Sequence, residues 1–169
     1  MNEEVEILTN GQDINEKIDQ LEVALLANFE TIDCPVKHYF VPGMYIREIF
    51  MPAGAKVTSL IHKTKHPFAV MKGKVSVFSE NDGVQLIEAP YNGITTPNTR
   101  RVLHVHHDCV WLTYHPTSIQ PTGDSKEEIE EAVRKVGEQI IDWRENPLLG
   151  GVVKNNQLME KQTEKCLTD

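Results

Sequence analysis

Hydrophobic residues near the start of the chain follow a helical period. They recur every three or four residues, which places them along one side of a helix; the members are Ile14, Ile18, Leu21, Leu25 and Phe29. Asp13 can cap this helix, with Glu16 as its capping-box partner. The helix should end near Asp33, because Pro35 disfavours helical dihedrals at Cys34. We interpret it as a packing element, with a partner-binding helix as the alternative.

From Val36 to about His115 the pattern changes to short runs of β-branched and aromatic residues separated by turn signals. The predicted strands are Tyr45–Met51, Lys56–Ile61, Ala69–Met71, Lys74–Ser79, Val84–Glu88, Gly93–Thr95, Val102–Val105 and Val110–Tyr114. No helical pattern separates them, so the sheet should be antiparallel, as in a sandwich or small barrel. Asp82 and Gly83 give the strongest hairpin signal.

A second helical pattern occupies the C-terminal part. Asp124 or Ser125 can cap it, and Glu128 lies in its first turn, where the helix dipole favours an anion. Its apolar stripe consists of Ile129, Val133, Val136 and Ile140. We expect this helix against the outside of the barrel or against a second subunit, followed beyond Pro147 by a partly ordered tail. The predicted organisation is an extension with a helix (1–35), a barrel (36–117), and a helix with a tail (118–169).

Composition limits the classes of function. The chain has 169 residues, 40% of them hydrophobic and 25% charged, as expected for one globular domain. A formal charge of -8 argues against a nucleic-acid polymer as partner, since that needs clustered basic residues. No apolar run reaches the ~20 residues of a membrane helix, and no signal peptide is evident. We therefore expect a cytoplasmic protein that does not bind membranes. Its three isolated cysteines should be reduced thiols.

Five of the seven histidines fall into two clusters, and imidazole is the commonest protein ligand of divalent transition metals. In the first cluster, His62 ends a strand and His66 immediately precedes Pro67, which argues against a helix there. A bend or bulge could still turn both rings inward. The alternative is that one of the two is a polar residue in an exposed turn.

In the second cluster, His104 and His106 are two residues apart and therefore share one side of a strand. This geometry can supply one or two metal ligands, and Asp108 could orient a ring by accepting a hydrogen bond from its other nitrogen. Parity leaves an alternative open. If Arg101 and Leu103 face inward, both histidines face outward.

Other residues are candidates for ligand contacts. Arg101 could bind a carboxylate or phosphate if it points inward, or lie on the surface beside Arg100. Strand parity groups the remaining candidates as Tyr45 with Arg47, and Trp111 with Thr113 and His115. A purely structural role is the alternative for each. Hydrolase, P-loop and dinucleotide-binding motifs are absent from the sequence, and we assign no catalytic residue.

The stretch from Gly54 to Gly73 resembles the first motif of the cupin superfamily, RmlC-like barrels of the double-stranded β-helix (jelly-roll) type. The family pattern is Gly, five residues, His-x-His, three or four residues, Glu, six residues, Gly. Counting back from Gly73 places His66 at the glutamate and His62 at the second histidine. Leu60 replaces the first.

A degenerate second motif is similar in the stretch from Pro97 to His106. It lacks the glycine of the family's Pro-x-Gly, and the expected histidine falls near Arg101 or Val102. His104 is the nearest substitute. The stretches GMYIREIFMPAG, IHKTKHPF and RRVLHVHHDCVWLTYHPT are also similar to uncharacterised cupin-like proteins of bacteriophages and prophages. The resemblance implies a barrel, a homodimer and, for a phage protein, the host cytoplasm.

These observations predict a small-molecule-binding protein of cupin type with a histidine-lined cavity. Its ligand would be small and polar or anionic, with one divalent transition metal (Fe, Mn, Ni or Zn) held by His62, His66 and His104 or His106 as one version. A first alternative is a metal-dependent enzyme of oxygenase or isomerase type. Others are a non-catalytic phage protein that sequesters a host metabolite or signal, and a structural or interaction scaffold. Whether the protein is an enzyme stays open.

Overall fold

The computed structural model describes residues 13–142 and 165–167. The elements are α2 (Ile14–Asn28), β1 (Thr31–Asp33), β2 (Val36–Val41), β3 (Met44–Met51), β4 (Lys56–Thr58), β5 (His66–Ser79), β6 (Gly83–Glu88), β7 (Tyr91–Thr95), β8 (Arg101–Pro116), α3 (Lys126–Ile140) and β9 (Lys165–Leu167). The predictions for residues 1–12 and for most of the tail lie outside the described residues.

Helix α2 confirms the first helical pattern. The Asp13 side chain accepts a hydrogen bond from the backbone N–H of Asn15 at 3.0 Å, so the predicted cap is in place. Ile18 and Leu25 are buried, at 0% and 4% exposure. The helix ends at Asn28, earlier than predicted, because the chain turns at Phe29 to an extended conformation that leads into β1.

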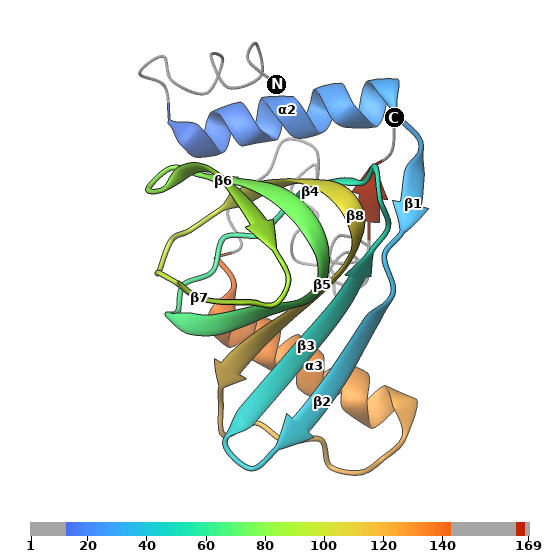
Figure 1. The fold of residues 1–169 in the computed structure, drawn as a ribbon. Coiled ribbons are helices and arrows are strands. Elements are labelled where there is room, and N and C mark those ends of the chain that lie inside the picture. Colours follow the sequence, from blue (N-terminus) through green and yellow to red (C-terminus); the bar gives the residue numbers. More distant parts are fainter. Residues whose placement is uncertain (1–12, 143–164, 168–169) are drawn as a thin grey trace.

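Helix α3 begins with a complete capping box between Ser125 and Glu128. On its buried side, Val136 and Ile140 pack against Tyr45 of β3. The helix therefore covers part of its own barrel. In Figure 1, α2 lies across one end of the curved sheet and α3 lies behind β2 and β3.

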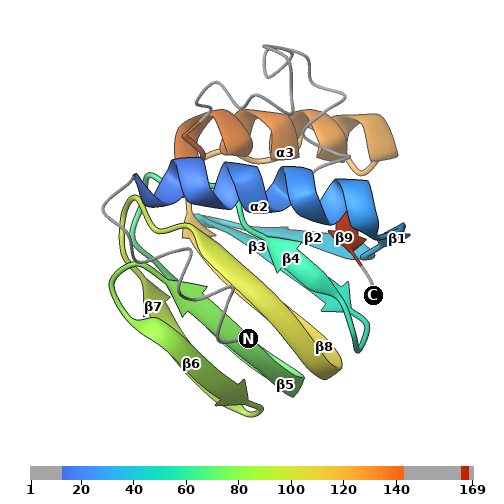
Figure 2. The same ribbon diagram turned by 90° about the horizontal axis from the view of Figure 1, so that it is seen from above.

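All strand pairs are antiparallel, as predicted, and β8 is the strand that connects the sheet. Along one edge, β8 pairs first with β4 and then with β3. Along the other edge it pairs with β5, which also pairs with β6 and β7. Figure 2 shows how this branched pairing curves the sheet. Strand β2 was not predicted; it pairs with β3 across the tight turn at Gly43.

Two pairs of predicted short strands are continuous in the structure. Ala69–Met71 and Lys74–Ser79 were predicted as separate strands on either side of Gly73, but β5 runs through it from His66 to Ser79 with an irregular register opposite β8. Gly73 has a φ of 96°, and a Cβ there would lie 2.4 Å from the Asp108 carbonyl oxygen. The glycine thus allows close contact of two backbones within a bulge. Strand β8 likewise unites the last two predicted strands.

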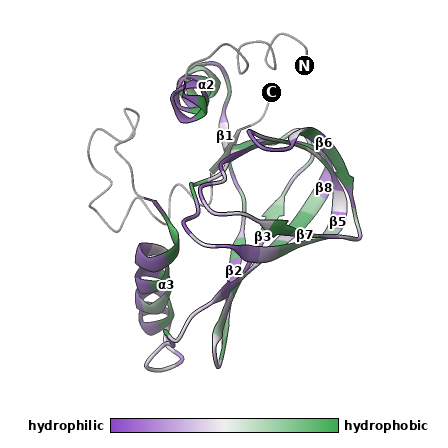
Figure 3. Ribbon diagram, turned by 90° about the vertical axis from the view of Figure 1, so that its left-hand side faces the viewer, coloured by the Kyte–Doolittle hydropathy of each residue, from purple (hydrophilic) through white to green (hydrophobic). Residues whose placement is uncertain are grey.

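The main core lies between the inward faces of the curved sheet. Val75 of β5, Val105 of β8 and Cys34 are fully or almost fully buried in it. Figure 3 shows apolar segments concentrated on the strands of the barrel, while α3 is largely hydrophilic. The alternation along β8 buries Leu103, Val105, Cys109, Trp111 and His115. Odd-numbered residues of this strand therefore supply the inward face at both of its ends.

The cysteine prediction is partly wrong. Cys34 takes part in a disulfide, whereas Cys109 is a free, buried thiol. Cys34 follows β1, and β1 pairs with β9 near the end of the chain. This pairing brings the segment before Cys34 next to a distant part of the chain, which no local sequence spacing indicated.

None of the helices within the described residues combines the length and hydropathy needed to cross a membrane.

Candidate metal and ligand site

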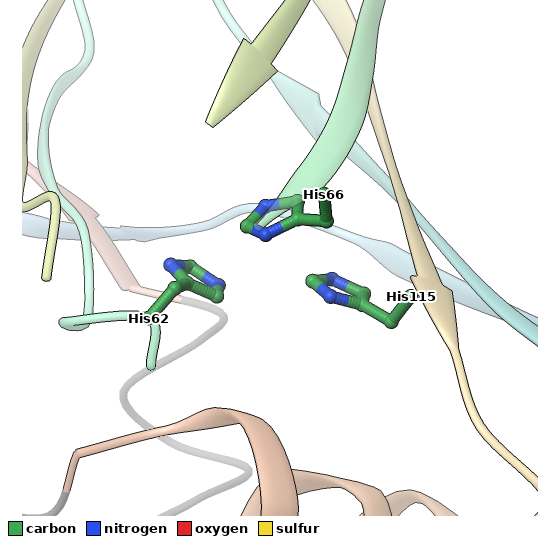
Figure 4. A group of neighbouring side chains, drawn as sticks. All are labelled: His62, His66 and His115. Atoms are coloured by element: carbon green, nitrogen blue, oxygen red, sulfur yellow. The ribbon is translucent and has the colours of Figure 1, made fainter. Parts of the chain in front are cut away.

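Three histidines from separate parts of the chain meet at one end of the barrel. His62 follows β4 and forms isolated bridges with Thr99 and with Ile141 just after α3. His66 is the first residue of β5, and His115 is the penultimate residue of β8. Because β5 and β8 pair there, the ends that carry His66 and His115 lie side by side. Figure 4 shows the three rings converging.

The histidine cluster is compact and largely shielded from solvent. Ring centroids lie 4.8 Å apart for His62 and His66, 4.3 Å for His66 and His115, and 5.6 Å for His62 and His115. His66 and His115 are each 1% exposed, and His62 is half-buried. One nitrogen from each ring can be chosen so that all three lie within 4.8 Å of one another.

Each ring presents a buried nitrogen without a hydrogen-bond partner among the described residues. These atoms are Nδ1 of His62, Nε2 of His66 and Nδ1 of His115. His66 Nδ1 lies 3.0 Å from the Thr64 carbonyl oxygen, which can only accept, so the proton is on Nδ1 and Nε2 carries a lone pair. His115 Nε2 lies 2.9 Å from Thr113 Oγ1. If Nε2 donates there, Nδ1 of His115 also carries a lone pair.

Burial keeps these imidazoles neutral. Desolvation, with smaller contributions from His66 and Arg47, lowers the pKa of His115 to about 3. Desolvation and the neighbouring His66 and His115 hold the pKa of His62 well below its usual range. Burial also lowers the pKa of His66, although the bond to Thr64 opposes this effect. Neutral imidazoles with available lone pairs are the form that binds metal ions.

The donor set fits a divalent transition metal. Metal–imidazole distances are ~2.0–2.1 Å, so nitrogens on one ion lie at most about 4.2 Å apart. The present spacing, within 4.8 Å, is slightly wider than that, and small ring rotations would close it. The carbonyl of Thr64 and the hydroxyl of Thr113 orient the rings of His66 and His115 through the other ring nitrogen, an arrangement common to metal-ligating histidines.

The cluster opens into a cavity of about 870 Å³ between the barrel and α3. The predicted ligand-contact residues Tyr45, Arg47, Arg101 and Trp111 all line it. Tyr45, 3% exposed, stacks beside His115 with ring centroids 5.9 Å apart. Burial raises the pKa of Tyr45 to about 12, so its hydroxyl stays protonated.

His38 is a cavity residue that the sequence interpretation missed. Its Nδ1 lies 2.7 Å from the Tyr45 hydroxyl, and burial together with Arg47 lowers its pKa to about 4. It lies on β2, which was not among the predicted strands. The alternation of Val36, His38 and Phe40 was the available signal.

His104 and His106 do not join the histidine cluster. They lie on the face of β8 opposite Leu103 and Val105, with their ring centroids 4.7 Å apart, and His106 Nε2 is 2.7 Å from Ser76 Oγ. The predicted grouping of either one with His62 and His66 is therefore corrected. The physical reason is strand parity, which turns even-numbered residues of β8 away from the interior. His115 completes the cluster instead.

No protein-family model matches the sequence, and no curated protein matches it. Solved structures similar to this chain include an RmlC-like cupin family protein with a double-stranded β-helix fold from Methanocaldococcus jannaschii, at 10% identity and a TM-score of 0.43, covering 50% of this chain and 81% of that chain. A cupin-2 domain containing protein from Shewanella frigidimarina has 12% identity and a TM-score of 0.42, covering 63% and 95%. Ectoine synthase from P. lautus has 11% identity and a TM-score of 0.44, covering 52% and 67%.

At these identities and TM-scores the similarity carries no conclusion about what this chain binds or does. The strand pairing itself confirms the predicted fold class as mainly antiparallel β with an N-terminal and a C-terminal helix. Within that fold lies a buried three-histidine cluster that could bind a metal.

Proposed function

We propose that this protein binds one divalent transition metal ion through His62, His66 and His115, and holds a small polar or anionic molecule in the adjoining cavity. The observation that supports this most directly is the histidine cluster itself: each ring has a buried nitrogen without a partner, and one nitrogen from each ring lies within 4.8 Å of the others. A buried acceptor without a partner costs roughly 1–3 kcal/mol, so three together are costly unless something fills the space between them.

The protein groups have distinct parts in this proposal. The three imidazoles hold the ion, while Thr64 and Thr113 set the ring orientations. Since all three ligands are neutral, a bound ion would keep its full charge and supply Lewis-acid chemistry to a molecule beside it. Arg47 and Arg101 provide positive charge along the cavity wall, which favours a polar or anionic molecule.

Metal analysis of the purified full-length chain tests the proposal. After incubation with Zn²⁺, Mn²⁺, Fe²⁺ or Ni²⁺ and removal of unbound ion, the wild type should retain about one equivalent of at least one of them. His115→Ala and His66→Ala should each retain less than about a tenth of that amount, because two remaining imidazoles bind a divalent ion far more weakly.

His107→Ala is the matched control, since it removes an exposed imidazole from the same strand as His115. Its metal content should equal that of the wild type. Far-UV circular dichroism and unfolding curves confirm that each variant is folded. Retention of a full equivalent by folded His115→Ala would contradict the assignment of His115, and failure of the wild type to retain any ion would leave a metal-free ligand-binding barrel.

A second candidate function is catalysis at the ion, favoured by the size of the cavity directly beside the cluster. Three protein ligands leave coordination positions that a substrate can reach. Azide added to the Co²⁺-loaded protein should therefore change its visible absorption spectrum. An unchanged spectrum at saturating azide would argue for a closed, structural ion.

Assembly as a homodimer, a cytoplasmic location and a phage source stay predictions from the sequence. Light scattering over a tenfold range of concentration tests the first of them. A concentration-independent monomer would contradict it.

A further inference from the structure

Arg101 is a half-buried cation of the cavity that forms no ion pair with the described residues. Its Nη1 donates a hydrogen bond to Thr95 Oγ1 at 3.0 Å, and its guanidinium carbon lies 5.0 Å from the centroid of the Phe68 ring. Phe68 stacks in turn on Trp111, with centroids 4.6 Å apart. These contacts hold the guanidinium in place, but neither Thr95 nor Phe68 supplies a negative charge.

Arg100, the preceding residue, provides a comparison, because it is an arginine with a structural role. Arg100 is 7% exposed, and its guanidinium lies 2.6 Å from Asp19 and 3.2 Å from Glu22 on α2. Buried charges are normally paired in this way. Arg101 has no carboxylate within ion-pair distance among the described residues; desolvation lowers its pKa, and the charge of Asp82 only partly opposes this effect.

The charged residues that line the cavity are divided between its two walls. The barrel wall of the cavity contributes Arg47, Arg101 and the histidines, whereas its acidic lining residues come from α3 and the loop before it: Asp124, Glu127, Glu130 and Glu131. Two of these already form ion pairs, Glu130 with Lys126 and Glu131 with Arg134. Arg101 therefore adds positive charge to the barrel side of the cavity, and a bound metal ion would add more.

We propose that the ligand of this cavity is a small organic carboxylate, with its carboxylate group bound by Arg101 and the rest of the molecule directed toward the histidine cluster. This inference rests on the proposed function in that the cluster and Arg101 line one cavity. A guanidinium presents two parallel N–H donors that match the two carboxylate oxygens.

The apolar wall favours an organic anion over inorganic phosphate. Leu103 and Trp111 share the inward face of β8 with Arg101 and line the same cavity, so they offer contact for a hydrocarbon body. A phosphate dianion would bring more charge and more acceptors than one guanidinium can satisfy.

Calorimetric titration of the metal-loaded, full-length protein with a panel of probes tests the inference. The panel comprises acetate, succinate and benzoate, the matching neutral amides acetamide, succinamide and benzamide, and inorganic phosphate. At least one carboxylate should bind, and its amide should bind at least tenfold more weakly. Arg101→Gln should weaken binding of that carboxylate by roughly tenfold to a hundredfold, the loss expected for a charge-assisted hydrogen-bonded pair.

Two further variants separate a specific contact from a general charge effect. Arg101→Lys keeps the charge but loses the paired donors, so its affinity should fall between those of the wild type and Arg101→Gln. Lys74→Gln removes one positive charge from the exterior, where Lys74 lies 3.6 Å from Glu88, and should bind like the wild type. Equal weakening in Lys74→Gln and Arg101→Gln would overturn the inference, as would phosphate binding more tightly than every carboxylate.

Failure of this inference is distinguishable from failure of the metal proposal. Metal content is measured on the same samples, and the titrations are repeated after chelation. Arg101-dependent carboxylate binding by a protein that retains no metal would sustain the carboxylate site and reject the metal. A full equivalent of metal without binding of any carboxylate, or with binding unchanged in folded Arg101→Gln, would sustain the metal and reject the carboxylate site.

Discussion

Both faces of β8 carry histidines, but the two groups of histidines have different surroundings. On the inward face, His115 is 1% exposed, has a ring nitrogen without a partner among the described residues, and lies beside two other histidines. On the outward face, His104 and His106 lie against each other, and the ring of His106 is hydrogen-bonded to Ser76. Residue type alone therefore does not define the site. The side of the strand decides which imidazoles share a cavity.

Two adjacent arginines, the first residue of β8 and the residue just before it, show the same contrast. Arg100 is held by two carboxylates of α2, so its charge is neutralised within the fold. Arg101 faces the cavity, where its described contacts are a hydroxyl and an aromatic ring. Adjacent residues of one type thus have separate roles, one in stability and one in our proposal for binding. Four experiments test these contrasts.

The largest effect is expected from Arg100, with Arg101 as its comparison. Arg100→Met should lower the free energy of unfolding by about 3–5 kcal/mol, because it leaves Asp19 buried without its partner. Arg101→Met should change it by less than about 1 kcal/mol, since no ion pair is lost. Urea unfolding measures both. Adding Asp19→Asn to Arg100→Met should recover part of the loss, and equal losses in the two single variants would remove the contrast.

The buried histidines should make the metal-free protein sensitive to acid. The pKa of His115 is about 3 in the folded chain, below the usual 6.5, so the unfolded state binds the proton more readily. Stability is therefore complete above pH 6.5 and is lost as the pH falls toward 3. At pH 4.5 the loss from His115 alone should be about 2–3 kcal/mol.

Urea unfolding in the presence of a chelator, at pH 7.5 and at pH 4.5, checks this expectation. His115→Gln keeps a polar side chain that does not titrate and should reduce the difference between the two pH values. A difference in His115→Gln as large as that of the wild type would show that other groups cause the acid sensitivity.

The contact between the Thr113 hydroxyl and His115 should contribute to metal affinity. Thr113→Val keeps the shape of the side chain but removes the hydroxyl that lies 2.9 Å from His115 Nε2. Loss of such an orienting contact typically costs tenfold to a hundredfold in metal affinity. Competition with a chromogenic chelator measures it. Thr113→Ser retains the hydroxyl and should stay close to the wild type; an equal loss in both variants would point to packing instead.

The smallest effect is expected on the outward face. Ser76→Ala removes the hydroxyl 2.7 Å from His106 Nε2 and should lower the free energy of unfolding by about 1 kcal/mol. Metal content should not change, because His106 points away from the cluster. A fall in metal content comparable to that of Thr113→Val would break the distinction between the two faces.

Local patterns predicted much of the fold. The periods of hydrophobic residues identified both helices and most strands, and the cap of α2 at Asp13 followed from residue type. Where prediction failed, interactions between distant segments were responsible. The predicted strands on either side of Gly73 were separate, yet pairing with β8 carries β5 through it as a bulge. The disulfide of Cys34 also depends on structure that no local spacing indicates.

The site was predicted in part. His62 and His66 were identified as a pair, and their rings do lie together. The third member was sought at His104 or His106, because these are close in sequence to the second motif of the cupin resemblance. His115 was recognised as a cavity candidate through its parity with Trp111. Its place beside His66 depends on the pairing of β5 with β8.

The sequence by itself determined both helices, most of the strands and which side chains alternate along each predicted strand, since these follow from backbone sterics and hydrophobic periodicity over a few residues. Only the tertiary structure decided which face of β8 is internal, and hence which histidines meet and which arginine is paired. The physical reason is that parity fixes relative direction along a strand, whereas the inward side is chosen by burial of the whole apolar face against distant strands.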